Sequence, residues 1–357
     1  MIYVLFILGF VLIIKGADFL IQGSSSLAGK MGISPMIIGL TVVAFGTSVP
    51  ELVINVFSAL SAETTDIALG NIVGSCISNI LLILGLTAAI FPLKVKVSTV
   101  WKELLFSLFA VGLLFVMAND IFFDNTRESV LGRTDGIILL SFFGIFLYYV
   151  IVEAMNDRKE HQKETRILEE EEYTRRLEEG EDQEKGKAGK ASPALDENGK
   201  ECNEEKGYVM ALKIFAGLIA LCFGGKWIVD GAVVIATKFG MSQYLISATI
   251  IAVGSSLPEL VTSLVAAYKK EPDLSVGNIV GSNIFNILWV LGVTCIIRPI
   301  PVPLDINVDL IFLILITVYL FLFLFVGKKY KLERWQGISF TILYIFYVVY
   351  IIMRKMN

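Results

Sequence analysis

The sequence of this chain contains one pattern twice, and that duplication limits the folds open to it. The two pairs of matching segments are GTSVPEL at 46–52 with GSSLPEL at 254–260, and ALGNIVGSCISNILLILG at 68–85 with SVGNIVGSNIFNILWVLG at 275–292. Each copy places one acidic residue, Glu51 or Glu259, inside an otherwise apolar stretch. A repeat of this kind indicates two copies of one structural unit that share a site where they meet.

The composition is that of a membrane protein. Of the 357 residues 55% are hydrophobic, and the mean hydropathy is +0.72. Runs of roughly 20 residues almost free of charge are long enough to span a bilayer. Residues 156–207 hold 17 acidic and 11 basic side chains, whereas the whole chain has a net charge of only −4. The acidic balance therefore belongs to one hydrophilic insert, and it gives no reason to expect a nucleic-acid partner.

Ten apolar segments are separated by glycine, proline or charged residues. Five precede the insert and five follow it: 1–23, 33–61, 66–92, 100–119 and 134–155, then 208–230, 241–268, 273–297, 306–327 and 336–353. Because five is odd, the second copy starts on the opposite side of the membrane, so the repeat is inverted in space. We therefore expect an all-α integral membrane protein with ten transmembrane helices. Two inverted five-helix repeats would occupy residues 1–155 and 208–357, and a charged loop, 156–207, would join them.

The distribution of Lys and Arg in the short loops favours an N-terminus outside the cell and an insert in the cytoplasm. The first half of the insert is dense in mixed charge and is compatible with a solvated helix, whereas the second half is expected to be disordered. A tether is its simplest role, although cation sensing by the acidic cluster Glu169–Glu172 is an alternative. No protein partner is indicated, and the four cysteines have no paired spacing that predicts a disulfide or a metal site.

The acidic residue of each copy requires an explanation, because an ionisable group inside a membrane segment is costly and is retained mainly for function. A proline precedes it in both copies, at Pro50 and Pro258. Proline lacks a backbone donor, so each helix is expected to break near Gly46 or Gly254 and to free carbonyl groups there. Broken helices at membrane depth are tolerated where they line a cavity, and their carbonyls bind cations.

The next segment of each copy supplies further polar groups. Ser75 and Asn79 are four residues apart, as are Ser282 and Asn286, so each pair shares one face of a helix. The glycines of the GNIVGS motif are expected to allow close helix packing. For the asparagines, a hydrogen bond between helices is an alternative to ion binding.

All these candidate ligands donate oxygen: two carboxylates, two amides, several hydroxyls and free carbonyls. Such a set suits hard cations such as Ca²⁺ and Na⁺ and disfavours Zn²⁺ or Cu. Two buried negative charges balance one Ca²⁺, or accept Na⁺ ions in its place, so competition for the pair is itself a mechanism of exchange. The two ions would be substrates, and no cofactor is expected.

The motifs GTSVPE with GNIVGSxxxN, and GSSLPE with GNIVGSNxxN, resemble the two alpha-repeats of the calcium/cation antiporter superfamily, most closely those of microbial sodium/calcium exchangers. The layout of five spans on each side of the insert extends the resemblance over nearly the whole chain apart from the insert. It implies an inverted-repeat bundle in which the second, third, seventh and eighth helices form the ion core. The first and sixth helices would slide across that core to alternate access.

Carried over by position, the resemblance assigns ligands in both copies. Ca²⁺ would bind Glu51 and Glu259 with backbone oxygens of Thr47 and Ser255, and Asn79 and Asn286 would complete the middle of the site. Flanking Na⁺ sites would use the Ala44 carbonyl, Ser48 and Ser75 on one side, and the Ala252 carbonyl, Ser256 and Ser282 on the other.

One departure from the family pattern bears on ion choice. Asn286 occupies a position at which several relatives, including the potassium-dependent exchangers, carry aspartate, which argues against K⁺ co-transport. The resemblance therefore implies a membrane transporter and not an enzyme: an electrogenic, K⁺-independent antiporter that extrudes Ca²⁺ with the Na⁺ gradient. Three alternatives stay open: an H⁺/Ca²⁺ exchanger, because a membrane glutamate also carries protons, a Ca²⁺ channel, and a scaffold that acts through its charged loop.

Overall fold

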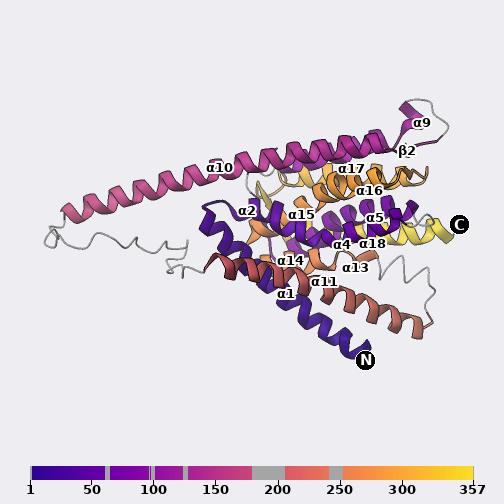
Figure 1. Ribbon diagram of the computed structural model, residues 1–357, viewed down its shortest axis with the longest axis horizontal. Coiled ribbons are helices and arrows are strands. Elements are labelled where there is room, and N and C mark those ends of the chain that lie inside the picture. The colour runs from indigo at the N-terminus through magenta and orange to yellow at the C-terminus, as the bar shows by residue number, and fades with distance from the viewer. Residues whose placement is uncertain are drawn as a thin grey trace.

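The computed structural model describes residues 2–60, 65–95, 97, 101–123, 128–178, 206–240 and 252–356, and most of them are helical (Figure 1). The first half contains α1 (Ile2–Met31), α2 (Pro35–Ile38), the π-helix η1 (Gly39–Val43), α3 (Ala44–Thr47), α4 (Val49–Leu60), α5 (Thr65–Ser78), the π-helix η2 (Asn79–Leu84), α6 (Gly85–Ile90), β1 (Leu93–Lys94), α8 (Glu103–Met117), α9 (Asp120–Phe123), β2 (Val130–Leu131) and α10 (Arg133–Glu178). The second half contains α11 (Gly207–Lys238), α13 (Ala252–Gly254), α14 (Leu257–Tyr268), α15 (Pro272–Ile284), the π-helix η4 (Phe285–Val290), α16 (Leu291–Ile297), β3 (Ile300–Pro301), α17 (Ile306–Phe323), β4 (Lys331–Leu332) and α18 (Arg334–Met356).

Each of the ten predicted apolar segments contains a helix or a broken helix, so the all-α membrane fold is confirmed. Among the described residues seven helices are long and apolar enough to cross a bilayer, and the bent pair Pro35–Thr47 with Val49–Leu60 makes an eighth. The two other segments contain shorter apolar helices, α8 and α14. Residues 241–251, which the sequence assigns to the same span as α14, lie outside the described part.

Contacts between glycines show that the two halves are inverted. A Cβ added to Gly9 would lie 3.0 Å from the carbonyl oxygen of Gly224, and one added to Gly16 would lie 2.9 Å from that of Gly217. The earlier glycine of α1 thus meets the later glycine of α11, so the two helices run antiparallel. In the repeat Gly9 corresponds to Gly217 and Gly16 to Gly224. Equivalent helices of the two halves therefore point in opposite directions.

Glycine contacts also join the two halves on the other side of the bundle. A Cβ added to Gly337 of α18 would lie 2.5 Å from the carbonyl oxygen of Gly85 in α6, and one added to Gly136 of α10 would lie 2.7 Å from that of Gly292 in α16. The short strands also pair between the halves: β1 is antiparallel to β4, and β2 is antiparallel to β3. The two strand pairs and these glycine crossings therefore all join one half to the other.

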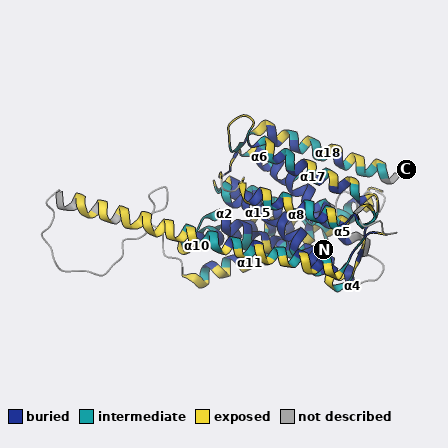
Figure 2. Ribbon diagram, turned by 90° about the horizontal axis from the view of Figure 1, so that it is seen from above, coloured by how far each residue is buried: buried dark blue, intermediate teal, exposed yellow. Residues whose placement is uncertain are grey.

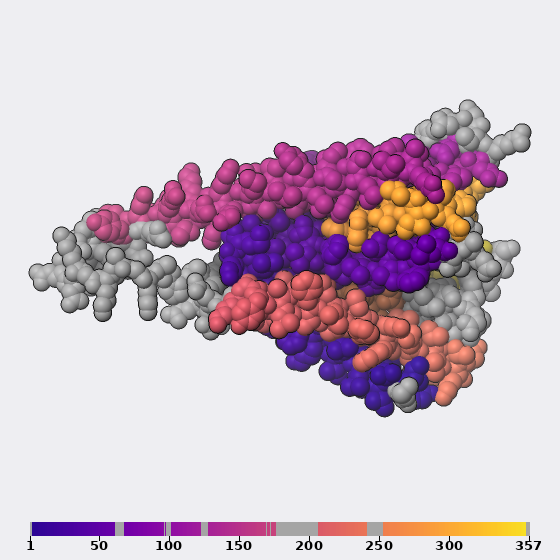
Figure 3. Space-filling model, viewed as in Figure 1, coloured from indigo at the N-terminus to yellow at the C-terminus, as the bar shows by residue number. Residues whose placement is uncertain are grey.

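The helices α1 and α11 form a pair that lies along one side of the bundle (Figure 3). Both extend about eight residues beyond the predicted ends at 23 and 230, and both are followed by a glycine with positive φ, +65° at Gly32 and +77° at Gly240. The small polar residues after Gly23 remain helical because this stretch still packs on α11, where a Cβ on Gly23 would lie 3.0 Å from the Met210 carbonyl oxygen.

The helix α10, which is described as far as Glu178, continues without a break across the predicted boundary at residue 155, and its part beyond the bundle is exposed up to Arg175 apart from two residues outside the described set (Figure 2). The helical reading for the first half of the insert is therefore correct, and the second half lies outside the described residues. Where α10 leaves the bundle, the carboxylate of its Asp157 accepts a hydrogen bond from the backbone N–H of Ser34, directly before α2, at 3.1 Å. The three-part division at 155 and 208 remains a prediction.

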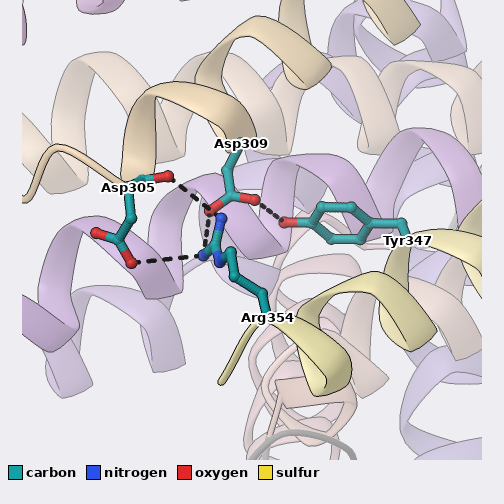
Figure 4. A network of polar contacts seen from close by, with 4 residues as sticks. All are labelled: Asp305, Asp309, Tyr347 and Arg354. Atoms are coloured by element: carbon teal, nitrogen blue, oxygen red, sulfur yellow. Dashed lines mark hydrogen bonds and ion pairs between the residues drawn. The ribbon is translucent and has the colours of Figure 1, made fainter. Parts of the chain in front are cut away.

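A polar cluster joins α17 to the end of α18 (Figure 4). Asp309 is buried, and its two carboxylate oxygens accept hydrogen bonds from Tyr347 at 3.2 Å and from Arg354 Nη2 at 3.0 Å. Arg354 also donates to the Asp305 carbonyl at 3.2 Å and lies 3.7 Å from its carboxylate. The charge of Asp309 is therefore compensated inside the bundle, unlike those of the two repeat glutamates described below.

Loss of Arg354 should destabilise the protein, because Asp309 would stay buried with an uncompensated charge. We expect Arg354→Gln to lower the free energy of unfolding by about 3 kcal/mol. The double variant Asp309→Asn/Arg354→Gln should recover most of this loss, since it removes both charges. Thermal unfolding of the purified protein in detergent measures both effects, and equal melting temperatures for the single and double variants would contradict the ion-pair explanation.

Candidate ion-binding site

Glu51 and Glu259 occupy equivalent places at the start of a helix. Glu51 lies in the first turn of α4 and Glu259 in the first turn of α14, where the free N–H groups of a helix favour negative charge. The two residues are 0% and 1% exposed, and each carboxylate is close enough to repel the other. Within the described part of the chain, none of their four carboxylate oxygens has a hydrogen-bond partner. A buried pair of this kind is stable as anions only when a cation neutralises it.

Each acid follows a break in its helix. The helix α3 ends at Thr47, Ser48 has φ −83° and ψ −1°, and α4 leaves at 42° to the preceding segment. In the second repeat α13 and α14 are separated by residues 255–256. Pro50 and Pro258 take the second position of α4 and α14, where the missing N–H has no helical partner to lose. The predicted breaks are therefore confirmed in both repeats.

The first-repeat break contacts the second repeat through Thr47. Its hydroxyl donates to Asn278 Oδ1 at 3.1 Å and lies 3.4 Å from the hydroxyl of Ser282, both on α15. Asn278 in turn donates through Nδ2 to the Ser263 hydroxyl at 3.0 Å, and it lies 3.5 Å from the Glu259 carbonyl oxygen. Thr47 also lies beside the Glu259 carboxylate. The break of one repeat is thus hydrogen-bonded into the acidic helix of the other.

Both asparagines of the predicted site lie where an α-helix changes to π geometry. Such π-helical turns are rare and occur frequently at functional sites. The π-helix η2 begins at Asn79, and η4 begins one residue before Asn286. Asn79 Nδ2 donates to Asn283 Oδ1 at 2.9 Å, and Asn79 Oδ1 is buried without a partner. Both head-group atoms of Asn286 are also buried without a partner among the described residues.

Most of the predicted ligands lie in this buried region. Those with side chains at most 3% exposed are Thr47, Ser48, Ser75, Asn79, Ser256, Ser282 and Asn286. The hydroxyls of Ser48, Ser75 and Ser256 have no partner among the described residues. The Ala44 carbonyl, by contrast, accepts the backbone N–H of Ser48 at 3.0 Å. Ala44 is buried at the start of α3, and Ser255 is half-buried. Ala252 begins α13, and its side chain is outside the described part.

Several polar residues that support these ligands were not predicted as part of the site. Asn278, Ser263 and Asn283 are all at most 2% exposed and make the hydrogen bonds given above. Asn55 and Thr262 lie one turn beyond the two glutamates, and each retains one buried oxygen without a partner. The signal for Asn278 was present, because it belongs to the repeated GNIVGS motif. Asn283 had no such signal, because the first repeat carries Cys76 at the matching position.

The helix α11 covers both breaks. A Cβ added to Gly46 would lie 2.2 Å from Leu218, and one added to Gly254 would lie 2.3 Å from Val229. Cys222 lies on α11 between these two contact residues, Leu218 and Val229. The glycine at the first position of each motif, Gly46 or Gly254, therefore leaves room for α11. This helix covers the site on that side.

A family model described as sodium/calcium exchanger protein matches residues 1–152 and 210–353. The chain belongs to the sodium/calcium exchanger family. It is 38% identical to the putative antiporter CaxA of Alkalimonas amylolytica over 82% of this chain and 80% of that protein. It is 27% identical to the sodium/calcium exchanger MaX1 of Methanosarcina acetivorans over 98% and 97%. A solved structure of the sodium-calcium exchanger NCX_Mj superposes with a TM-score of 0.74 at 30% identity and covers 98% of both chains.

Membership of this family confirms that the protein is a multi-pass membrane transporter of the exchanger type and not an enzyme. The ten-helix architecture expected from the sequence is likewise that of the NCX_Mj structure. In this chain the repeated motifs of the two halves form one buried cluster.

The contact of α11 with the breaks leads to a steric prediction. Gly254→Ala should destabilise the exchanger by about 1–3 kcal/mol, because the new methyl group meets Val229, whose branched side chain has little freedom to move. A second change, Val229→Ala, should restore most of the stability by making room. Gly112→Ala in α8 is the matched control, because a Cβ there meets nothing within 4 Å in the described part of the chain. Thermal unfolding of all four proteins measures the effect, and a double variant no more stable than Gly254→Ala would argue against this contact.

Proposed function

We propose that this exchanger is a Na⁺/Ca²⁺ antiporter that uses the inward Na⁺ gradient to extrude Ca²⁺ by alternating access. The observation that carries the proposal is the pair of buried glutamates, whose carboxylates have no hydrogen-bond partner among the described residues and lie in a region with buried hydroxyl and amide groups. Oxygen-only sites of this kind suit Ca²⁺ and Na⁺. The names of MaX1 and NCX_Mj, a sodium/calcium and a sodium-calcium exchanger, support the same pair of ions.

In this proposal Ca²⁺ lies between the two glutamates. The ligands proposed for Ca²⁺ are Glu51, Glu259 and the backbone oxygens of Thr47 and Ser255, with Asn79 and Asn286 at the middle of the site. The flanking Na⁺ ligands are the Ala44 carbonyl, Ser48 and Ser75 on one side, and the Ala252 carbonyl, Ser256 and Ser282 on the other. The burial of the acids, the unpartnered hydroxyls and the Thr47 contact with α15 support this arrangement.

Exchange follows from competition for one pair of negative charges. Ca²⁺ neutralises the pair in one half of the cycle and Na⁺ neutralises it in the other, so the site is not driven across the membrane with two uncompensated charges. The site residues include no third acid for a K⁺ ion, since Asn286 carries an amide. If about three Na⁺ exchange for one Ca²⁺, a net charge moves and turnover depends on voltage.

The proposed movement is a slide of the α1–α11 pair across the core helices. It is supported by the cover that α11 forms over both breaks and by the continuous packing of α1 against α11. The excess of Lys and Arg in loops on one side favours a cell-membrane orientation with the N-terminus outside and the exposed end of α10 in the cytoplasm.

Removal of either acid should abolish transport without unfolding the protein. We expect Glu51→Gln and Glu259→Gln to lose Na⁺-driven ⁴⁵Ca²⁺ uptake in proteoliposomes. Ca²⁺ at about 100 times its dissociation constant should stabilise the wild type by about 2.7 kcal/mol, and it should not stabilise either variant. Glu103→Gln is the matched control, because Glu103 is also a buried acid in a membrane helix but is bonded to Tyr149 at 2.7 Å. Unimpaired uptake in either glutamine variant would reject this site.

The coupling ion is tested by separate gradients. Ca²⁺-loaded proteoliposomes should release ⁴⁵Ca²⁺ when an inward Na⁺ gradient is applied, and a K⁺ gradient or a pH gradient alone should give no release. A clamped membrane potential should change the Na⁺-driven rate, because net charge moves. Release driven by pH without Na⁺ would instead identify an H⁺/Ca²⁺ exchanger, and flux without any counter-ion would identify a channel.

A further inference from the structure

We propose that Asn283 of α15 is a positioning residue that orients Asn79, a ligand of the first repeat, so that its amide oxygen and not its N–H groups faces the transported ion. The inference rests on the proposed function, because it concerns a ligand of a cation. Asn283 does not need to touch the ion. It acts through a hydrogen bond to a residue that does.

Asn283 determines which end of the Asn79 amide faces the site. A carboxamide presents a donor on one side and an acceptor on the other, and only the acceptor favours a cation. Asn79 Nδ2 donates to Asn283 Oδ1 at 2.9 Å, and this bond leaves Asn79 Oδ1 buried and without a partner. A reversed amide would present N–H groups to the cation. Asn283 therefore holds Asn79 in the orientation that binds cations.

The arrangement is asymmetric, and the asymmetry is visible in the sequence. The residue that matches Asn283 in the first repeat is Cys76, whose thiol is a poor acceptor and lies 3.9 Å from the Asn283 backbone carbonyl. Consistent with this, the Asn286 amide, which matches Asn79, has no partner at either head-group atom among the described residues. The second repeat therefore fixes a ligand of the first, whereas the first does not fix the equivalent ligand of the second.

A double-mutant cycle between positions 79 and 283 tests the inference. Asn283→Leu removes the acceptor at nearly constant size, and it should weaken Ca²⁺ binding to the purified full-length protein about fivefold in isothermal titration calorimetry. In an Asn79→Asp background both head-group atoms are oxygen, so orientation no longer matters, and the same Leu substitution should change the affinity less than about twofold. Asn283→Asp keeps the acceptor and should bind Ca²⁺ no more than about twofold more weakly than the wild type.

The outcomes separate a positioning role from a packing role. An equal loss of affinity from Asn283→Leu in both backgrounds, or an unchanged affinity in the wild-type background, would overturn the proposal. If the Leu variant does not fold, as judged by size-exclusion chromatography, the Asp variant decides. A loss of Ca²⁺ affinity of about fivefold in Asn283→Asp would then overturn the proposal. A wild type that binds Ca²⁺ but does not exchange it for Na⁺ would overturn the proposed function and leave this test intact. A wild type that does not bind Ca²⁺ would overturn both.

Discussion

The electrostatic repulsion between two buried carboxylates is the constraint on which the rest of the structure depends. Each acid alone is costly in an apolar bundle, and bringing the two within range of each other adds to the cost. The helix breaks reduce it, since they place each carboxylate at the N-terminus of a helix and free oxygens for a cation beside it. The cluster at Asp309 shows the other solution, in which an arginine and a tyrosine satisfy a buried acid permanently. The repeat glutamates have no such partner among the described residues and are left for a mobile charge.

Small residues give this site its shape. Glycine allows α11 to lie against both breaks and allows the motif helix α15 to approach α2 and η1, where a Cβ on Gly277 would lie 2.6 Å from the Met36 carbonyl oxygen and 3.0 Å from the Leu40 nitrogen. The prediction that Gly277 and Gly281 serve close packing is therefore correct. The matching glycines Gly70 and Gly74 have no neighbour within 4 Å in the described part of the chain, and the segment equivalent to η1, residues 247–251, lies outside it.

Much of this architecture is predictable from the sequence, because duplication, span parity and proline position are properties of the chain itself. The repeat located both acids and both breaks, and the odd number of spans gave the inversion that the glycine pairs of α1 and α11 confirm. The predicted ends of the first and sixth spans were about eight residues short, because hydropathy falls where a helix leaves the apolar layer, whereas α1 and α11 continue almost to Gly32 and Gly240. Asn283 was missed for a different reason. Its role depends on a partner 204 positions away in sequence, at Asn79, and no periodicity records that pairing.

The glycine crossings of α1 and α11 have a consequence for the uncoupled leakage of ions through the protein. Because the backbones of these helices touch at Gly9 with Gly224 and at Gly16 with Gly217, neither helix has room to advance without carrying its partner along. The two helices are equivalent by inversion, so in the proposed slide the displacement that uncovers the site toward one compartment would be the one that covers it toward the other. A continuous pore would require the two helices to separate along their length and to lose these backbone contacts. In the proposed antiport, the tightness of coupling between the two ion gradients would thereby depend on the absence of side chains at four positions.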